Sequence, residues 1–187
     1  MIRKDKNKFY LSSLIFALSF GLLGCSHQSP TIYVLPPQKM SIEKLRTTYI
    51  HTLQDQGIQV IHEGEEVRIV LPDDYLFEPD SANIREEYKP TLQVVAKLIK
   101  SYDKINVKVA AYLDNQSNQR YLQALSTRQA QVVSDFLWYH GVDTRLLYAV
   151  GYAHANAVDW NGDEMGRSHN RRVEISFRYY PHTALYN

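Results

Sequence analysis

The stretch Gly166 to Ile175, GRSHNRRVEI, combines a group of cations with the start of a strand. Arg167, Arg171 and Arg172 form the densest positive cluster of the chain outside its N-terminus. From residue 173 to residue 180 apolar side chains alternate with more polar ones, which is the period of a strand with one face on a core. The sequence therefore predicts arginines at the point where a loop enters a strand.

This arginine cluster has two interpretations. A guanidinium group has the planar geometry that suits a carboxylate, so the segment is a candidate acceptor for an acidic group of a ligand. A set of ion pairs on the protein surface would have the same composition, and composition alone favours that second interpretation. The choice between them depends on the rest of the chain.

Length and composition indicate one folded domain with a tail. The chain has 187 residues, of which 44% are hydrophobic, and 14 tyrosines, enough to bury one core. Its formal net charge of +1 gives no general attraction to nucleic acid, and it has neither a basic helix nor the spacing of a zinc site. We therefore expect no nucleic-acid partner.

Residues 1–24 have the order of an export signal. Four cations come first, Arg3, Lys4, Lys6 and Lys8. An apolar run to Leu23 follows, and it is short for a span of the membrane. The alternative is a signal anchor that is not removed.

The apolar run ends in Leu22-Leu23-Gly24-Cys25, which resembles the lipobox of bacterial lipoproteins. The resemblance implies cleavage before Cys25, diacylglycerol and a further acyl chain such as palmitate on this residue, and, with Ser26 next, export to the periplasmic face of the outer membrane. Cys25 is the only cysteine, so an intrachain disulfide is excluded. Residues 25–40 contain three prolines and few charges, and we expect them to form an extended lipidated tether.

Residues 41–66 are expected to form an N-terminal extension made of a helix and a strand. Ser41 is a candidate N-cap, and Gly57 is placed to end the helix. Two alternating runs at 58–61 and 67–71 predict a hairpin around the turn at residues 62–65.

Residues 67–180 continue with alternating helices and strands. Further helices are expected from Lys89-Pro90 and after residue 120, and strands at 105–113, 146–152 and from 173 onward. Leu76-Phe77 is an apolar pair that should pack into the core. The order predicts an α+β fold with helices packed on a small mixed sheet, followed by a tail at 181–187.

The chain from about 67 to 177 resembles the OmpA-like (OmpA/MotB/Pal) C-terminal domain. The resemblance is carried in order by Leu76-Phe77-Glu78 with Ser81-Ala82, Leu125-Ser126 with Ala130 and Val133, Gly151-Tyr152, and Gly166-Arg167 with Asn170-Arg171-Arg172-Val173-Glu174. It implies a two-layer domain that binds peptidoglycan without a covalent bond.

The resemblance also implies a site for meso-diaminopimelate in the stem peptide, which carries an ammonium and a carboxylate on one carbon. By similarity Asp114 takes the ammonium and Arg171 the carboxylate, with Arg128 as a third contact. The second arginine of the family falls on Gln129, one position after Arg128, a rotation of about 100° along a helix. This departure leaves open whether peptidoglycan is bound.

The sequence contains no complete set of residues for a metal site or a hydrolase active site. Asp159, Asn161 and Asp163 have the opening spacing of a calcium loop, but Glu164 stands at the glycine position and Asn170 at that of the bidentate glutamate. No histidine pair or nucleophile motif for a hydrolase occurs. We expect neither an enzyme nor a bound cofactor or metal.

Two functions remain open. The first is an outer-membrane lipoprotein that anchors an envelope complex to peptidoglycan; the resemblance extends to lipoproteins of type IV secretion systems, whose other subunits would be partners. The second is a structural subunit that uses the same fold as a scaffold for proteins and binds no peptidoglycan. Asp114 and Arg171 favour the first function, and the loss of arginine at position 129 favours the second.

Overall fold

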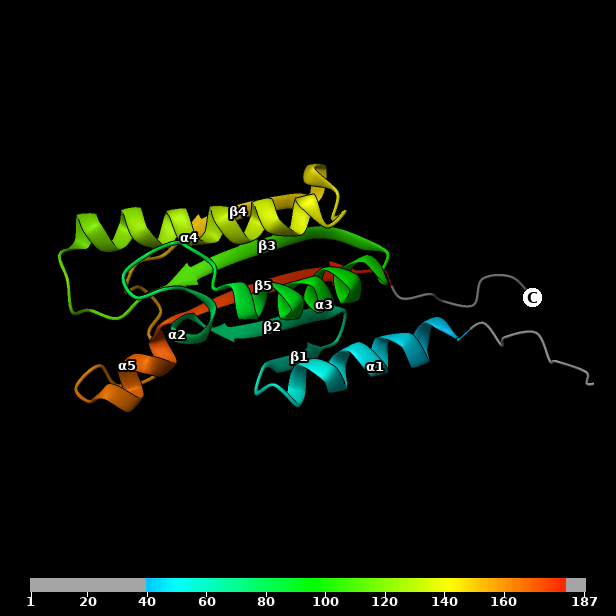
Figure 1. Cartoon of the computed structure of the whole chain (residues 1–187), viewed down its shortest axis with the longest axis horizontal. Helices are drawn as coiled ribbons and strands as arrows, with labels where there is room; N and C mark the ends of the chain where they lie inside the picture. Colours follow the sequence, from blue (N-terminus) through cyan, green and yellow to red (C-terminus); the bar gives the residue numbers. More distant parts are fainter. Residues whose placement is uncertain (1–39, 181–187) are drawn as a thin grey trace, which may run out of the picture. The chain divides into compact units, whose positions relative to one another are not determined.

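The computed structural model describes residues 40–180 (Figure 1). The predicted signal, Cys25, the tether up to residue 39 and the tail at 181–187 lie outside the described residues. Between Met40 and Tyr180, none of the helices is both long enough and apolar enough to cross a membrane.

The described residues form a mixed sheet of five strands in the order β1-β2-β5-β3-β4. Its strands are β1 (Gln59–Glu63), β2 (Glu66–Pro72), β3 (Lys104–Tyr112), β4 (Leu147–Gly151) and β5 (Arg172–Tyr179). β3 and β4 pair in parallel, whereas all other neighbours are antiparallel. The last strand in sequence is therefore central in the sheet, between β2 and β3.

Helices cover one face of this sheet, as Figure 1 shows for α3 and α4. The α-helices are α1 (Ile42–Gln54), α2 (Asp73–Leu76), α3 (Lys89–Lys100), α4 (Gln119–Tyr139) and α5 (Glu164–Asn170), and the 3-10 helices are η1 (Glu86–Tyr88) and η2 (Thr144–Leu146). The predicted α+β class, with helices on a small mixed sheet and an N-terminal helix and hairpin, is confirmed.

The core lies between the helices and the sheet. Val107, Val109, Val173 and Ile175 have no exposed surface, and Val109 pairs directly with Ile175 across β3 and β5. Alternation along each strand places these side chains on the helix-covered face and Glu174 and Ser176 on the other. The period-2 pattern thus predicted the correct face of β5.

The N-terminal extension also follows the prediction. The Ser41 hydroxyl accepts a hydrogen bond from the Lys44 amide at 3.3 Å and so caps α1. β1 and β2 form the hairpin, with Gly64 at φ 61° in its turn, a conformation that glycine adopts without strain. The expected burial of Leu76 and Phe77 is confirmed, since both are 1% exposed.

Two details differ from the predicted pattern. Alternation in the predicted strand at 105–113 places Ile105 on the same face as Val107 and Val109, but Ile105 is 41% exposed because the register of β3 shifts between Lys104 and Asn106. The loop before the last strand contains a short helix, α5, so Arg167 lies on a helix, and Arg171 is the residue that ends it.

Candidate functional site

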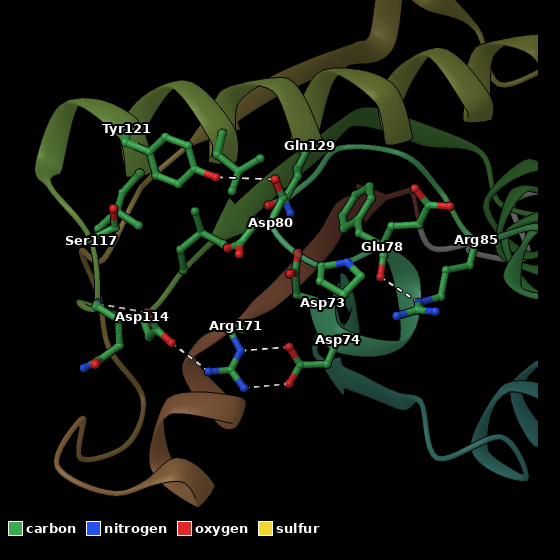
Figure 2. Close-up of a pocket in the computed structure, with 16 residues that line it drawn as sticks. Asp73, Asp74, Glu78, Asp80, Arg85, Asp114, Ser117, Tyr121, Gln129 and Arg171 are labelled. Atoms are coloured by element: carbon green, nitrogen blue, oxygen red, sulfur yellow. Dashed lines mark hydrogen bonds and ion pairs between the residues drawn. The ribbon is translucent and has the colours of Figure 1, made fainter.

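A pocket of about 740 Å³ opens where α2, the end of β3, the start of α4 and the start of β5 meet (Figure 2). One part of its lining is apolar and consists of Phe77, Pro79, Leu113, Leu122 and Leu125. The charged part comprises the carboxylates of Asp73, Asp74, Glu78, Asp80 and Asp114 and the guanidiniums of Arg85 and Arg171. Acidic groups therefore outnumber basic ones in the pocket.

Arg171 pairs with three carboxylates at this pocket. Its Nε and Nη2 atoms each donate a hydrogen bond of 2.8 Å to Asp74, in a bidentate arrangement. Nη1 donates to Asp114 Oδ2 at 2.7 Å, and Nη2 also donates to Glu164 Oε1 at 2.6 Å. The hydrogen bonds to Asp74 are the main cause that holds the pKa of Arg171 above its ordinary value.

Asp114 lies just beyond the end of β3 and is 8% exposed. Its Oδ1 accepts a hydrogen bond from the Gln116 amide at 3.0 Å, while Oδ2 accepts from Arg171. The structure thus brings Asp114 and Arg171, the two main residues of the predicted site, into direct contact (Figure 2). Each already pairs with the other and with further groups of the protein.

The helix α5 and its loop position Arg171. Asp163 caps α5 by accepting from the Gly166 amide at 2.7 Å. The buried Asn170 accepts from the amides of Val158 and Asp159 at 2.7 and 3.0 Å, and its Nδ2 donates to the Asp159 carbonyl at 2.9 Å. These bonds tie the preceding loop to the residue before Arg171, which fixes the backbone from which the guanidinium extends.

Asp73, the first residue of α2, is a buried acid beside this pair. Its amide donates to the Arg171 carbonyl at 3.0 Å, and its side chain lines the pocket. Burial, helped by the neighbouring charge of Asp74, raises the pKa of Asp73 to about 7. Its Oδ1 is buried without a hydrogen-bond partner among the described residues.

Gln129 reaches the same pocket from α4 and is only 1% exposed. Its Nε2 donates to the Ser81 carbonyl at 3.0 Å. Its Oε1, like Asp73 Oδ1, is buried without a partner in the described part of the chain. A neutral amide therefore occupies the inward position on this turn of α4.

Arg128, the third predicted contact, does not line this pocket. It is exposed on α4 and borders two shallower grooves outside the pocket. The reason is the displacement by one residue, which turns its side chain by about 100° from the inward direction of Gln129.

Arg172 lies on the sheet face opposite the helices, as strand alternation predicts. It is 5% exposed, its guanidinium lies 4.0 Å from the centre of the Tyr112 ring, and its Nε donates to Glu174 at 2.7 Å. Because it faces the opposite side from Arg171, Arg172→Ala would be the natural control for Arg171→Ala, provided that the fold is unharmed. Its burial makes it unsuitable, because truncation would leave the carboxylate of Glu174 without its partner.

The loop with calcium-like spacing uses its polar groups internally. Asp159 pairs with His169 at 2.7 Å, and Asn161 Oδ1 accepts from Asn170 at 2.9 Å. Within residues 40–180 the structure contains no group of three or more acidic, histidine or cysteine side chains able to hold a metal ion.

Sequence reasoning missed Asp73, Asp74 and Glu164 as site residues. Asp73 and Asp74 follow the predicted strand at 67–71 in a Pro-Asp-Asp sequence that is ordinary for the end of a strand, and Glu164 entered only as a departure from a calcium loop. The sole local signal was the pair of adjacent acids after a predicted strand end. These acids come together around Arg171 only in the folded structure.

Comparisons with known proteins agree with this architecture. The family model described as "OmpA family" matches residues 76–171, just over half of the chain. The chain is 30% identical over 124 residues to the probable lipoprotein YiaD of Escherichia coli, covering 66% of this chain and 57% of YiaD. It is 28% identical over 165 residues to the outer-membrane lipoprotein YfiB of Pseudomonas aeruginosa, covering 88% and 90% of the two chains.

A solved structure has the same fold. The cell wall anchor of the type VI secretion system (T6SS) from Pseudomonas aeruginosa superposes with a TM-score of 0.66 at 27% identity, covering 72% of this chain and 96% of that one. These relatives are named as lipoproteins and a cell wall anchor, not as enzymes. From the family model, which matches residues 76–171, we conclude that the chain belongs to the OmpA family.

Proposed function

We propose that this protein is an outer-membrane lipoprotein that anchors an envelope complex to peptidoglycan through its OmpA-like domain. In this proposal residues 1–24 are removed, Cys25 carries the lipid, and residues 25–40 are the tether. Residues 41–66 form the N-terminal extension, residues 67–180 bind the cell wall on the periplasmic face of the outer membrane, and 181–187 are a tail. The family of the chain and its similarity to two lipoproteins and a cell wall anchor support the proposal.

The observation that carries it is the pair of Asp114 and Arg171 at the pocket, at 2.7 Å. The proposed ligand, the meso-diaminopimelate of a stem peptide, carries an ammonium and a carboxylate on one carbon. When such a ligand enters, the ion pair between the acid and the base can open, and each of the two then pairs with the oppositely charged group of the ligand. The ammonium would bind Asp114 and the carboxylate would bind Arg171, so neither member of this pair would be left without a partner.

The other partners of Arg171 can give way to a ligand. The side chains of Glu164 and Asp74 are 67% and 44% exposed, whereas that of Asp114 is 11% exposed. Ion pairs with an exposed partner contribute little, so Glu164, which accepts one hydrogen bond from Arg171, is released to water more readily than Asp74, which accepts two. In this proposal the less exposed Asp114 stays in place to bind the ligand ammonium, while the ligand carboxylate replaces the more exposed acids, Glu164 and Asp74, on Arg171.

Sedimentation of the purified protein with peptidoglycan sacculi tests this function. Asp114→Ala and Arg171→Ala should each weaken binding by about 2 kcal/mol, roughly a thirtyfold loss, because each removes a charge-assisted contact. Binding curves at several protein concentrations would give the two affinities, and circular dichroism would show whether each variant is folded.

Two matched controls separate a local contact from a change of net charge. Arg128→Ala removes a positive charge from the exposed side of α4, outside the pocket, and Asp143→Ala removes a negative charge whose partner is the exposed Arg145. Both should bind sacculi like the wild type. Equal losses in the controls and in the pocket variants would contradict a site at Asp114 and Arg171.

The scaffold function is the second candidate, and the full pairing of Arg171 with three carboxylates favours it. Failure of the wild-type protein to sediment with sacculi would favour the scaffold function over peptidoglycan binding. The type IV secretion system expected from the sequence stays a prediction, to be tested by whether the subunits of such a system copurify with the protein.

A further inference from the structure

Trp160 lies in the loop between β4 and α5, outside the pocket, and it is 71% exposed. Single exposed apolar residues are common on protein surfaces. What distinguishes Trp160 is the way in which its ring is held. The contacts of the ring and of the backbone beneath it show which kind of ligand it suits.

The backbone of Gly162 covers one face of the Trp160 ring. A Cβ atom at position 162 would overlap three adjacent atoms of the six-membered ring, Cε2, Cζ2 and Cη2. Overlap with an atom and both of its neighbours places Gly162 over the plane of the ring and not at its edge. Because most of the residue is exposed, the opposite face of the ring is open to solvent.

The backbone beneath the ring is fixed as well. The Trp160 amide donates to Asp159 Oδ1 at 2.7 Å, and the Trp160 carbonyl packs so closely on Gly166 that a Cβ atom there would overlap it. Asn170 holds the amide and the carbonyl of Asp159 through hydrogen bonds of 3.0 and 2.9 Å. The free ring face is therefore oriented in advance, which lowers the entropic cost of binding.

A free aromatic face held in this way suits a sugar. A pyranose ring carries C–H groups on its faces and hydroxyl groups at its edge, and the polarised C–H groups are attracted to the negative face of an aromatic ring. Beside Trp160, the half-exposed side chains of Asp159 and His169 pair at 2.7 Å and offer hydrogen bonds to hydroxyl groups.

The charge of the loop disfavours an anionic partner such as a phospholipid surface. Residues 153–170 contain three acids and one arginine, namely Asp159, Asp163, Glu164 and Arg167. Anionic lipid headgroups attract basic segments and repel acidic ones, whereas a neutral sugar is not repelled.

The helix α5 connects this ring to the pocket. Gly166, which packs on Trp160, lies on the same helix as Glu164, whose carboxylate accepts from Arg171 at 2.6 Å. Figure 1 shows α5 at the end of the sheet where α2 lies. The five residues from Gly166 to Arg171 span about 8 Å at the rise of a helix. Diaminopimelate is the third residue of a stem peptide, so about 10 Å of extended chain separates it from the sugar.

We propose that Trp160 is a stacking platform for a sugar ring of the glycan strand, with Gly162 as the residue that positions it. The assignment of this sugar to peptidoglycan rests on the proposed function. A stem peptide at Arg171 places its own sugar within reach of Trp160. The second contact then forms within the same ligand and raises the affinity of the whole.

Calorimetric titration of the full chain in detergent with two soluble ligands tests the platform. The ligands are an N-acetylated meso-diaminopimelate tripeptide and the same tripeptide attached to its disaccharide of N-acetylglucosamine and N-acetylmuramic acid. The disaccharide should raise the affinity of the wild type about fivefold, and Trp160→Ala should remove this gain. No gain from the disaccharide, or a gain that persists in Trp160→Ala, would overturn the proposal.

Further variants separate stacking from a structural role of the loop. Trp160→Phe keeps a ring face and should keep most of the gain, whereas Gly162→Ala should reduce it, because the new Cβ displaces the indole. Trp138→Ala, which removes a 56% exposed indole from α4, should behave like the wild type. None of these variants should change the affinity for the tripeptide alone. A loss of tripeptide affinity in Trp160→Ala would mean that the loop only supports the pocket, and it would also overturn the platform.

A neutral oligosaccharide separates this inference from the proposed function. The oligosaccharide is the tetramer of N-acetylglucosamine, titrated against the fluorescence of Trp160 in a Trp138→Phe background, where it should change the emission. Tripeptide binding and sacculus sedimentation without any effect of sugar would keep the anchoring function and overturn the platform. A response of Trp160 to the tetramer without tripeptide binding or sedimentation would keep the platform and remove peptidoglycan as its source. No response to any ligand would overturn both.

Discussion

At the scale of single residues, the charges around Arg171 do not balance. One guanidinium pairs with Asp74, Asp114 and Glu164, and the buried Asp73 lies beside this group. A fourth charged carboxyl in a poorly solvated position is unfavourable, so Asp73 holds its proton to an unusually high pH. Its pKa is raised from 3.8 to about 7, mainly by burial and then by the charge of Asp74.

This raised pKa predicts how the stability depends on pH. Between pH 3.8 and about 7 the folded protein keeps a proton that the unfolded chain has lost. The stability linked to that proton is present below pH 3.8 and is lost as the pH rises through about 7. Asp73→Asn should therefore raise the free energy of unfolding at pH 8 by on the order of 1 to 3 kcal/mol, and by less at pH 5.

Urea denaturation of both proteins at the two pH values measures this difference. Asp143→Asn is the control, because hydrogen bonds from Arg145 lower the pKa of Asp143 to about 2, and it should show no difference between pH 5 and pH 8. An equal effect of Asp73→Asn at both pH values would mean that the proton is not held on Asp73.

At the scale of elements, β5 organises the domain. It is the central strand, paired with β2 on one side and β3 on the other, and Arg171 immediately precedes it. Val173, Ile175 and Phe177 fill the core under the helices, so packing of this strand fixes the direction in which Arg171 enters the pocket. Core packing and site geometry are thus set by the same eight-residue strand.

Ile175→Ala tests this role of β5. The side chain has no exposed surface and pairs with Val109 and Ile69 on the two neighbouring strands. Its truncation leaves a cavity and should lower the free energy of unfolding by about 2 to 4 kcal/mol, measured from the midpoint of chemical denaturation. Ser176→Ala, on the other face of the strand, should change it by about 0.5 kcal/mol or less. Similar effects of the two substitutions would contradict the assigned faces.

At the scale of the whole molecule, the proposed function needs an anchor as well as a pocket. The anchor is predicted from the sequence at Cys25, outside the described residues. Residues 26–39 of the tether, about fourteen residues, would span on the order of 40 Å when extended, so the domain could reach the cell wall from the membrane. Anchoring and wall binding should therefore be separable by mutation.

Cys25→Ser should abolish lipid attachment and release the protein from the outer-membrane fraction, because the serine hydroxyl cannot replace the thiol that carries the lipid. Metabolic labelling with palmitate and membrane fractionation measure the two effects. The released protein should still bind sacculi as the wild type does. A Cys25→Ser protein that keeps its label and its place in the membrane fraction would show that the anchor is elsewhere.

The sequence alone determined the five strands, the helices α1, α3 and α4, and the two main members of the candidate site. Local periodicity predicts strands such as β5, because alternate side chains must face the core, and caps such as Ser41 and Gly57 mark helix ends. Asp114 and Arg171 were found because Asp114 follows the end of one predicted strand and Arg171 precedes the start of another. Both lie in segments that resemble a family motif. The short helix α5 was missed because it has few apolar residues and depends on bonds made by Asn170.

Only the tertiary structure decided what surrounds Arg171. Its partners Asp74 and Asp114 lie 97 and 57 residues away in the sequence, far beyond the reach of any local pattern. The raised pKa of Asp73 and the unpartnered oxygen of Gln129 likewise come from burial, which depends on how α2 and α4 pack around the end of the sheet. Composition and spacing specify which groups are available, but the distance between charges and their access to water are set only when the chain is folded.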